Sequence, residues 1–285
     1  MAMCAGARSR LTRERGVIPA LLRRAYRAVR GGSRAAAIPM SALAYVEPGN
    51  QWYRPVFAGV SSLSPRVSRA PAVRRALAVL EQLDCDAYHN YVMNFYRAGL
   101  GQLGEAWMYA DLYTTLGGLA ATIRPRHYLE IGVRRGHSMS MVAANAPEAR
   151  IYGFDLWVQD YAGLENPGEA FVRTQLTRVG YRGRVEFTAG DSANTVPAFL
   201  AAHRDLYFDL ISVDGDHSAR GARLDLVHVL PRLTIGGVLV FDDLVNPSHP
   251  ELRAVWNETV ASDPRFATWS FDEAGFGVAF AVRTA

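Results

Sequence analysis

The chain has 285 residues, of which 49% are hydrophobic and 20% charged, and its formal net charge is +4. This composition supports one large core and excludes a chain that is mostly disordered. Every one of its 31 basic residues is Arg, which we interpret as a bias of coding composition. Residues 1–40 hold nine Arg against Glu14, so the rest of the chain is net acidic. A basic face for nucleic acid is therefore not indicated.

Two cysteines, Cys4 and Cys85, are too few for a disulfide framework, which suits a reducing cytoplasm. No apolar run approaches the roughly 20 residues of a membrane span. The N-terminal residues lack the apolar core of a signal peptide. We therefore expect a cytoplasmic protein without a membrane partner.

The first 110 residues show no strand pattern and are predicted to form two regions. Residues 1–40 are rich in Arg and Ala and are expected to be partly disordered, although Val17–Val29 could form a basic amphipathic helix. Residues 41–110 are predicted to be a cap that covers the substrate site or joins the subunits of a homo-oligomer. Trp and Tyr gather in this region, and aromatic rings can stack on a substrate while excluding water.

Local patterns divide the cap region further. We expect an irregular segment over 41–70 and a helix over Ala70–Leu83. The Gly-rich stretch Gly99–Gly104 follows no strand and contains no Lys, so we interpret it as a linker and not as a phosphate loop. A helix from Glu105 to Ile123 is then predicted to precede the first strand.

Residues 111–285 alternate short apolar strands with helical spacers of roughly 20–30 residues. This alternation predicts right-handed βαβ crossovers and a parallel sheet. The last two strands flank a Glu-Ala-Gly turn, so their hairpin adds an antiparallel strand. We expect an α/β fold, a Rossmann-like doubly wound seven-stranded sheet that is mostly parallel, with a mainly helical or irregular N-terminal region. The predicted strands are His127–Ile131, Ile151–Asp155, Val185–Ala189, Phe208–Val213, Gly237–Phe241, Phe266–Phe271 and Phe276–Val282.

The first of these strands ends in Glu130 and runs into a turn with two glycines, Gly132 and Gly136, followed by Ser138. Gly132 permits a conformation that a side chain would hinder. Gly136 would let the turn approach a ligand closely at the carboxyl edge of the sheet. The spacing departs from GxGxxG, and the acid precedes the first glycine. A dinucleotide pyrophosphate would be repelled there, whereas a cationic ligand such as S-adenosylmethionine would be tolerated.

Four later strands also end in acids, and parallel strands bring these ends to one edge. Asp155, after the second strand, is placed to accept hydrogen bonds from ribose hydroxyls. Asp191 and Ser192, after the third strand, could bind the exocyclic amine of adenine. A single acid of this kind is often only a helix cap, but several in one crevice indicate a ligand or a cation.

The last two acidic strand ends predict a metal site with a base beside it. Asp214, Asp242 and Asp243 offer three carboxylates, which suit Mg²⁺ or a similar divalent cation better than structural zinc. His217 follows Asp214 by three residues, and its usual pKa suits the removal of a hydroxyl proton. The alternative is that His217 caps the next helix and that Asp216 alone coordinates.

With these residues, the chain resembles class I S-adenosylmethionine-dependent methyltransferases over about residues 110–285. The stretch Glu130–Gly136 is similar to the family's first motif, Asp155 to its ribose-binding acid, and Gly190-Asp191-Ser192 to its adenine-side motif. The Asp214–His217 stretch with Asp242-Asp243 resembles metal-dependent macrolide sugar O-methyltransferases and cephalosporin-hydroxylase-like relatives. This resemblance implies that Asp214 and the paired acids hold Mg²⁺ and that His217 is the base. Catechol-type relatives use Lys as the base, and this chain has none.

These observations together predict an S-adenosylmethionine-dependent O-methyltransferase that acts on a hydroxyl of a small natural product, such as a sugar or glycoside. Residues 1–40, 41–110 and 111–285 would be the basic segment, the cap and the cofactor-binding domain. Two alternatives stay open. One is a metal-independent methyltransferase whose acids bind only the cofactor, and the other is a nucleotide-binding scaffold protein without turnover. The sequence does not name the substrate, the methylated position or the oligomeric state.

Overall fold

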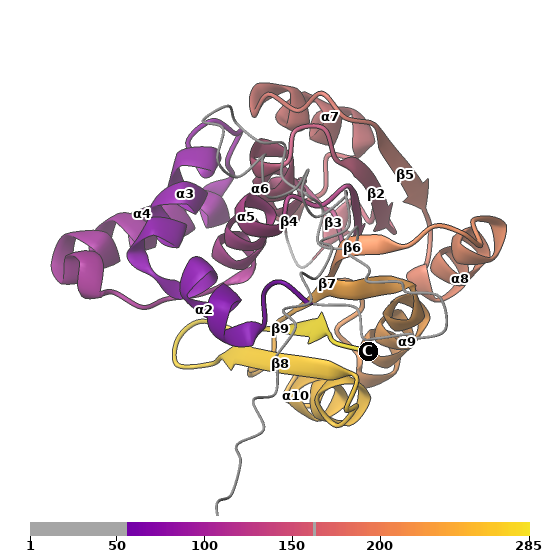
Figure 1. The fold of residues 1–285 in the computed structure, drawn as a ribbon. Helices are drawn as coiled ribbons and strands as arrows, with labels where there is room; N and C mark the ends of the chain where they lie inside the picture. Colours follow the sequence, from indigo (N-terminus) through magenta and orange to yellow (C-terminus); the bar gives the residue numbers. More distant parts are fainter. Residues whose placement is uncertain (1–55, 162–163) are drawn as a thin grey trace, which may run out of the picture. The chain divides into compact units, whose positions relative to one another are not determined.

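The structure is a computed structural model and describes residues 56–161 and 164–285. Seven strands form one sheet in the order β5-β2-β1-β6-β7-β9-β8 (Figure 1). Only β9 runs antiparallel to its neighbours, and the other strands share one direction. Two short strands, Asp160–Tyr161 and Leu164–Glu165, pair separately as β3 and β4. The sheet strands are β1 His127–Ile131, β2 Arg150–Asp155, β5 Val185–Ala189, β6 Phe208–Val213, β7 Leu233–Asp242, β8 Phe266–Phe271 and β9 Val278–Arg283.

Helices precede the first strand and then alternate with the strands. Among the described residues, four lie before the sheet: α2 Val60–Ser68, α3 Ala70–Leu80, α4 Ala87–Leu103 and α5 Leu112–Ile123, with a 3-10 turn η2 at Gly104–Ala106. The crossover and flanking helices are α6 His137–Asn145, α7 Glu169–Arg178, α8 Ser192–Ala202, α9 Ala219–Val229 and α10 Leu252–Trp256. Two short turns of helix complete the set, η3 Leu230–Arg232 and η4 Asn257–Ala261.

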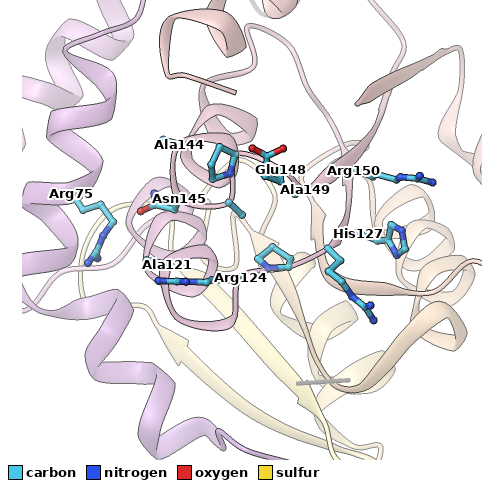
Figure 2. A pocket seen from close by; sticks show the side chains of 13 residues that line it. Arg75, Ala121, Arg124, His127, Ala144, Asn145, Glu148, Ala149 and Arg150 are labelled. Atoms are coloured by element: carbon cyan, nitrogen blue, oxygen red, sulfur yellow. The ribbon is translucent and has the colours of Figure 1, made fainter. Parts of the chain in front are cut away.

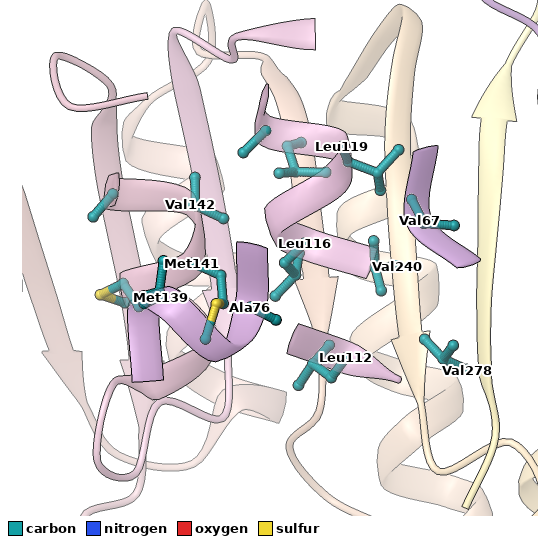
Figure 3. Packing of buried hydrophobic residues seen from close by; sticks show 14 of the residues in the cluster. Val67, Ala76, Leu112, Leu116, Leu119, Met139, Met141, Val142, Val240 and Val278 are labelled. Carbon is teal, nitrogen blue, oxygen red and sulfur yellow. The ribbon is translucent and has the colours of Figure 1, made fainter. Parts of the chain in front are cut away.

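The two faces of the sheet are covered by two separate hydrophobic clusters. On one face, residues of α2, α3, α5 and α6 form one cluster with residues of β1, β2, β6, β7 and β9, and Figure 3 shows Leu116 of α5 close to Val240 of β7. On the other face, residues of α8, α9 and α10 form a second cluster with residues of β1, β2, β6, β7 and β9. Successive residues of β1 alternate between the clusters, since Tyr128 belongs to the first and Leu129 to the second. Burial on both faces explains why the central strands read as continuous apolar runs.

The predicted fold class is confirmed by this topology. Every predicted sheet strand is present, and β7 begins at Leu233, four residues before the predicted start at Gly237. The earlier start follows Pro231, where the chain leaves η3 and enters the sheet. The terminal hairpin contributes β8 and β9, and β9 is the antiparallel strand.

Three predictions for the N-terminal region are wrong. The expected linker at Gly99–Gly104 is mostly the last part of α4, because Gly99 leaves room for Trp107: an added Cβ would lie 2.2 Å from that ring. The expected helix from Glu105 begins only at Leu112, since Asp111 caps it by accepting from the Thr114 amide at 2.9 Å. The irregular segment expected over 41–70 contains α2.

The predicted Val17–Val29 helix lies outside the described residues, as do the 1–40 segment and the first aromatic residues of the cap. Within the described residues, no helix is both long and apolar enough to cross a membrane.

Candidate functional site

The carboxyl ends of the parallel strands meet at one edge of the sheet. Ile131 is in register with Phe154 of β2 and Val213 of β6, and Val213 is in register with Phe241 of β7. The residues that follow these positions therefore lie side by side, as parallel strands are about 4.8 Å apart. The glycine turn, Asp155, Asp214 and Asp242 accordingly share one edge, as the sequence predicted.

The glycine turn needs its glycines for packing. Gly132 has a φ of +88°, and an added Cβ would lie 1.8 Å from the carbonyl oxygen of Asp214. Gly136 has a φ of +70° and precedes α6, where an added Cβ would lie 2.5 Å from Val172 of α7. A side chain at Gly132 would push apart two backbone segments of the site. The turn is thus built against the loop that carries Asp214.

Glu130 is fully buried below this turn. Its carboxyl group accepts from the Tyr128 hydroxyl at 2.8 Å and from the Ser138 hydroxyl. Burial raises the pKa of Glu130 to about 8, and the two hydroxyl groups only partly offset that rise. The observed contacts fasten β1 to the first turn of α6, and the contact with a cofactor stays a prediction.

Asp155 folds back onto the turn. One carboxylate oxygen accepts from the backbone amides of Val133 and Arg134 at 2.8 and 2.7 Å. The other accepts from the Trp157 amide at 2.6 Å and from Asn166 Nδ2 at 3.2 Å. The acid predicted to bind ribose therefore also fixes the conformation of the turn.

Asp191 and Ser192 open α8 at the adjoining strand end. Asp191 is exposed and caps the helix by accepting from the Ala193 amide at 2.9 Å. Asp191 is therefore a helix cap, which is the alternative that the sequence left open for such acids. Ser192 faces the buried carboxyl group of Asp225 on α9, whose pKa is raised to about 6 by burial. Their contact with adenine stays a prediction.

The densest group of potential metal ligands consists of Asp214, His217 and Asp243. Their ligand atoms all lie within 4.8 Å of one another. His217 Nε2 lies 3.2 Å from Asp214 Oδ1 and 3.4 Å from Asp243 Oδ2. Burial alone would lower the pKa of His217, but the hydrogen bond to Asp214 and the surrounding carboxylate charges outweigh burial and raise it.

Asp243, a member of this group, has an unusual backbone conformation. Its φ is +59°, in the left-handed region that a side chain rarely adopts. Its carboxylate also accepts from Asn246 Nδ2 at 3.1 Å. Asp242, the last residue of β7, is not a member of the three-residue group, although the pKa of Asp242 is raised well above its usual value by burial and by the charges of Asp214 and Asp243. Its place as a metal ligand stays a prediction.

This group fits a divalent cation. Neighbouring ligands of an octahedral ion are about 3.0 Å apart when each ion–ligand bond is about 2.1 Å. Asp214 and Asp243 supply carboxylate oxygens, which such an ion prefers, and their ligand atoms lie within 4.8 Å of one another. Burial also raises the pKa of Asp214, and a cation would relieve the mutual repulsion of these carboxylates.

Sequence reasoning missed two residues beside this group. The rings of His249 and His217 lie 5.1 Å apart, measured between their centres, and Asn246 orients Asp243. Both lie in the stretch Asn246-Pro-Ser-His249, which begins three residues after Asp243. That proximity in the sequence was the available signal.

The cap region also contributes to the site. Tyr88 of α4 is 40% exposed, and it lies close enough to the acidic strand ends to be affected by their charges. Burial raises the pKa of Tyr88, and the charges of Asp242, Asp111, Asp214 and Asp243 raise it further. An aromatic residue of the cap therefore lies beside the carboxylate group. The role of residues 41–110 as a cap over the substrate stays a prediction.

The segment before α4 is fastened to the glycine turn. Asp86 accepts from Arg134 Nη2 at 2.9 Å, and the His89 ring stacks on His137 with their centres 3.6 Å apart. Asp86 also caps α4 and bonds the His89 ring at 2.6 Å. These contacts fix the position of the start of α4, and therefore of Tyr88, relative to the glycine turn.

Comparison with known proteins gives one family and several similar folds. A family described as a methyltransferase domain matches residues 129–244. No curated protein matches the chain. Among solved structures, the O-methyltransferase TomG from Streptomyces achromogenes in complex with S-adenosylmethionine is 20% identical, with a TM-score of 0.49, over 75% of this chain and 90% of that one. An O-methyltransferase from Bacillus cereus is 17% identical, with a TM-score of 0.49, over 75% of this chain and 91% of that one.

A third similar structure is the methyltransferase PaMTH1 from Podospora anserina, which is 16% identical, with a TM-score of 0.48, over 79% of this chain and 94% of that one. The family match covers the segment from β1 to the residue after the paired acids, which holds every predicted site residue. Residues 129–244 therefore match this methyltransferase family, and the resemblance to methyltransferases is confirmed over that segment.

Proposed function

We propose that the protein is an S-adenosylmethionine-dependent O-methyltransferase with a divalent cation and a histidine base. The observation that carries this proposal is the placement of His217 between Asp214 and Asp243, beside the glycine turn of a methyltransferase domain. A base that contacts two carboxylates at the carboxyl edge suits proton removal from a hydroxyl group.

The cofactor would lie across the glycine turn. Gly132 and Gly136 shape this turn, and Asp155 holds it by its amides. In the proposal, Asp155 exchanges some of these bonds for ribose hydroxyls, and Asp191 with Ser192 contacts the adenine. Ser138 and Glu130 support the methionine end, and the absence of a neighbouring phosphate-binding Lys suits a cationic ligand.

The cation would be held by Asp214 and Asp243, with Asp242 as the further carboxylate. When bound, it would lower the pKa of a substrate hydroxyl that it contacts. His217 then accepts the hydroxyl proton at Nε2, and Asp214 and Asp243 stabilise the resulting imidazolium. When bound, S-adenosylmethionine would supply the methyl group to the substrate oxygen, and its sulfur would keep the electron pair of the broken carbon–sulfur bond as S-adenosylhomocysteine. Positioning of the two reactants supplies most of the remaining rate.

The substrate is proposed to be a small hydroxylated natural product such as a sugar or glycoside. Tyr88 supports this choice because an exposed tyrosine beside carboxylates offers both a stacking surface and a hydroxyl group.

The test combines binding with turnover. Calorimetry should show that S-adenosylhomocysteine binds, and methyl transfer to a panel of phenols and glycosides should need Mg²⁺. His217→Ala should lower the rate by about 10²–10⁴ while cofactor affinity stays nearly unchanged. His249→Ala is the matched control, because this ring is adjacent to His217 but forms no ion pair with a carboxylate among the described residues. Full activity in EDTA would remove the metal role, and undiminished turnover of His217→Ala would remove the base.

A further inference from the structure

Arg134 belongs to the glycine turn, but its side chain contacts the segment that leads into α4. Arg134 Nη2 donates to Asp86 Oδ2 at 2.9 Å, and the two side chains are only 24% and 19% exposed. An ion pair that is largely shielded from water is screened less than a surface pair. It joins the turn that would hold the cofactor to the helix that carries Tyr88.

The backbone of Arg134 is held from the other side. Its amide donates to Asp155 Oδ2 at 2.7 Å, and its φ of +46° lies in the left-handed region that side chains rarely adopt. Such a conformation persists only where the surroundings fix it. Arg134 therefore has two anchors. The acid proposed to bind ribose holds its amide, and Asp86 holds its guanidinium group.

Asp86 passes this contact on to the first turn of α4. Its Oδ1 accepts from the His89 amide at 3.0 Å, and its backbone carbonyl accepts from the Asn90 amide at 3.0 Å. Burial lowers the pKa of His89 to about 4, so the ring is neutral at neutral pH. It donates from Nδ1 to Asp86 at 2.6 Å and accepts at Nε2 from the Tyr113 hydroxyl at 2.9 Å. The first turn of α4, which includes Tyr88, is thus built on Asp86.

The other contacts between the glycine turn and this segment are weaker or lie elsewhere. Arg135 Nε is 3.9 Å from Asp86, and its two terminal nitrogens donate instead to Glu165 at 2.8 Å and to the Asp84 carbonyl at 3.1 Å. The ring of His137 stacks on His89, and burial lowers the pKa of both rings, so this stack joins two neutral groups. Arg134 therefore makes the closest charged contact with Asp86.

We propose that Arg134 is a positioning residue that couples occupation of the cofactor site to the position of Tyr88. This inference rests on the proposed function, since it assumes that S-adenosylmethionine occupies the glycine turn. Opening of the turn releases Asp86 from Arg134 and loosens the first turn of α4, and a bound cofactor suppresses that opening. Occupation of the cofactor site therefore orders the aromatic residue beside the carboxylate group.

Hydrogen exchange of the full chain, followed by NMR, tests this coupling with S-adenosylhomocysteine as the probe. The reporters are the amides of His89 and Asn90, because both donate to Asp86. A ligand at about 100 times its Kd can slow the opening of its site by up to about a hundredfold. We expect exchange of the reporter amides in the wild type to slow by at least about tenfold.

Two variants break the Arg134–Asp86 pair from opposite sides. Arg134→Met keeps the aliphatic part of the side chain and the amide that donates to Asp155. Asp86→Asn removes the charge but keeps a residue type that caps helices well. Each variant should speed exchange of the reporter amides and reduce the slowing by S-adenosylhomocysteine to about threefold or less. This difference between free and bound protein is a readout that a purely structural role of Arg134 would leave unchanged.

Arg178→Gln is the matched control. Arg178 pairs with Asp84 at 2.8 Å, so it fastens the same segment two residues before Asp86, but from α7. Arg150→Gln is a remote control, because Arg150 begins β2 at the opposite end from Asp155 and borders the hollow shown in Figure 2. Both variants should keep the full effect of S-adenosylhomocysteine on the reporter amides.

A full ligand effect in both Arg134→Met and Asp86→Asn would overturn the proposal. Equal loss of the effect in Arg178→Gln would also overturn it, since any contact that fastens the segment would then suffice. Binding of S-adenosylhomocysteine to the wild type without slower exchange of the reporter amides would refute the coupling alone. Failure of S-adenosylhomocysteine to bind would refute the proposed function, and the coupling with it.

Discussion

Replacing Glu130 with Gln should make the protein more stable at neutral and alkaline pH. Glu130 is fully buried, and its carboxyl group bonds the hydroxyls of Tyr128 and Ser138. Gln has nearly the same shape and never ionises; its oxygen can accept from one hydroxyl, and its amide nitrogen can donate to the other once that hydroxyl turns to accept. The variant therefore isolates the cost of placing a carboxylate at this position.

The pKa gives the size and sign of the effect. Burial raises the pKa of Glu130 from 4.5 to about 8, so the folded protein holds this proton over a range in which the unfolded chain has lost it. The stability that Glu130 contributes is complete below pH 4.5 and is lost as the pH rises to about 8. At about 1.36 kcal/mol per pH unit, the loss is on the order of 5 kcal/mol.

The assay is urea unfolding of the wild type and Glu130→Gln at several pH values. The free energy of unfolding of the variant, relative to the wild type, should increase by about 1.4 kcal/mol per unit from pH 4.5 and level off near pH 8. Glu186→Gln is the control, because Glu186 is exposed on β5 and has no ion pair in the described part of the chain. A difference that does not change between pH 5 and pH 8 would refute the reasoning.

Three further predictions concern the same edge of the sheet. Gly132→Ala should lower the free energy of unfolding by at least about 3 kcal/mol, because its Cβ would lie 1.8 Å from a backbone oxygen at a φ of +88°. Gly101→Ala is its control, since no atom lies near an added Cβ there, and this change should stabilise α4 by about 0.5–1 kcal/mol. Thermal or urea unfolding measures both effects. Asp155→Ala should lose about 1–3 kcal/mol of stability with its amide bonds and weaken S-adenosylhomocysteine binding at least tenfold in calorimetry; unchanged affinity would leave it only a structural role. The rate of methyl transfer should rise with pH as His217 loses its proton. The neighbouring carboxylates raise the pKa of His217 in the metal-free protein, so added Mg²⁺ should move this rise in rate to lower pH. A pH–rate profile that is the same for the wild type and His217→Ala would contradict this.

The sheet could be predicted because its signals are local. Apolar runs of strand length, spaced by helical patterns, specify the parallel strands, and the Glu-Ala-Gly turn marks the last hairpin. The helix α4 was missed because Gly99 and Gly101 read as a linker, whereas the need for space beside Trp107 is a tertiary contact. Local propensity carries no information about such a contact.

The sequence predicted which acids share one edge of the sheet, but not which of them contact His217. Strand ends brought the acids together, as expected for parallel strands. Which acid joins His217 depends on the left-handed backbone of Asp243, which the sequence does not show. The hydrogen bond between Tyr128 and Glu130 could have been predicted, because residues two apart on a strand share a face. The bonds from Asp155 to the turn depend on how the two loops fold together.

The most direct measurement is a crystal structure of the protein soaked with S-adenosylhomocysteine and Mn²⁺, whose anomalous scattering identifies the ion. The account predicts the cofactor product across Gly132 and Gly136, with its ribose near Asp155. It also predicts Mn²⁺ bound by Asp214 and Asp243, with His217 facing the open substrate position. Cofactor product bound elsewhere, or Mn²⁺ absent from these carboxylates at saturating concentration, would contradict the account.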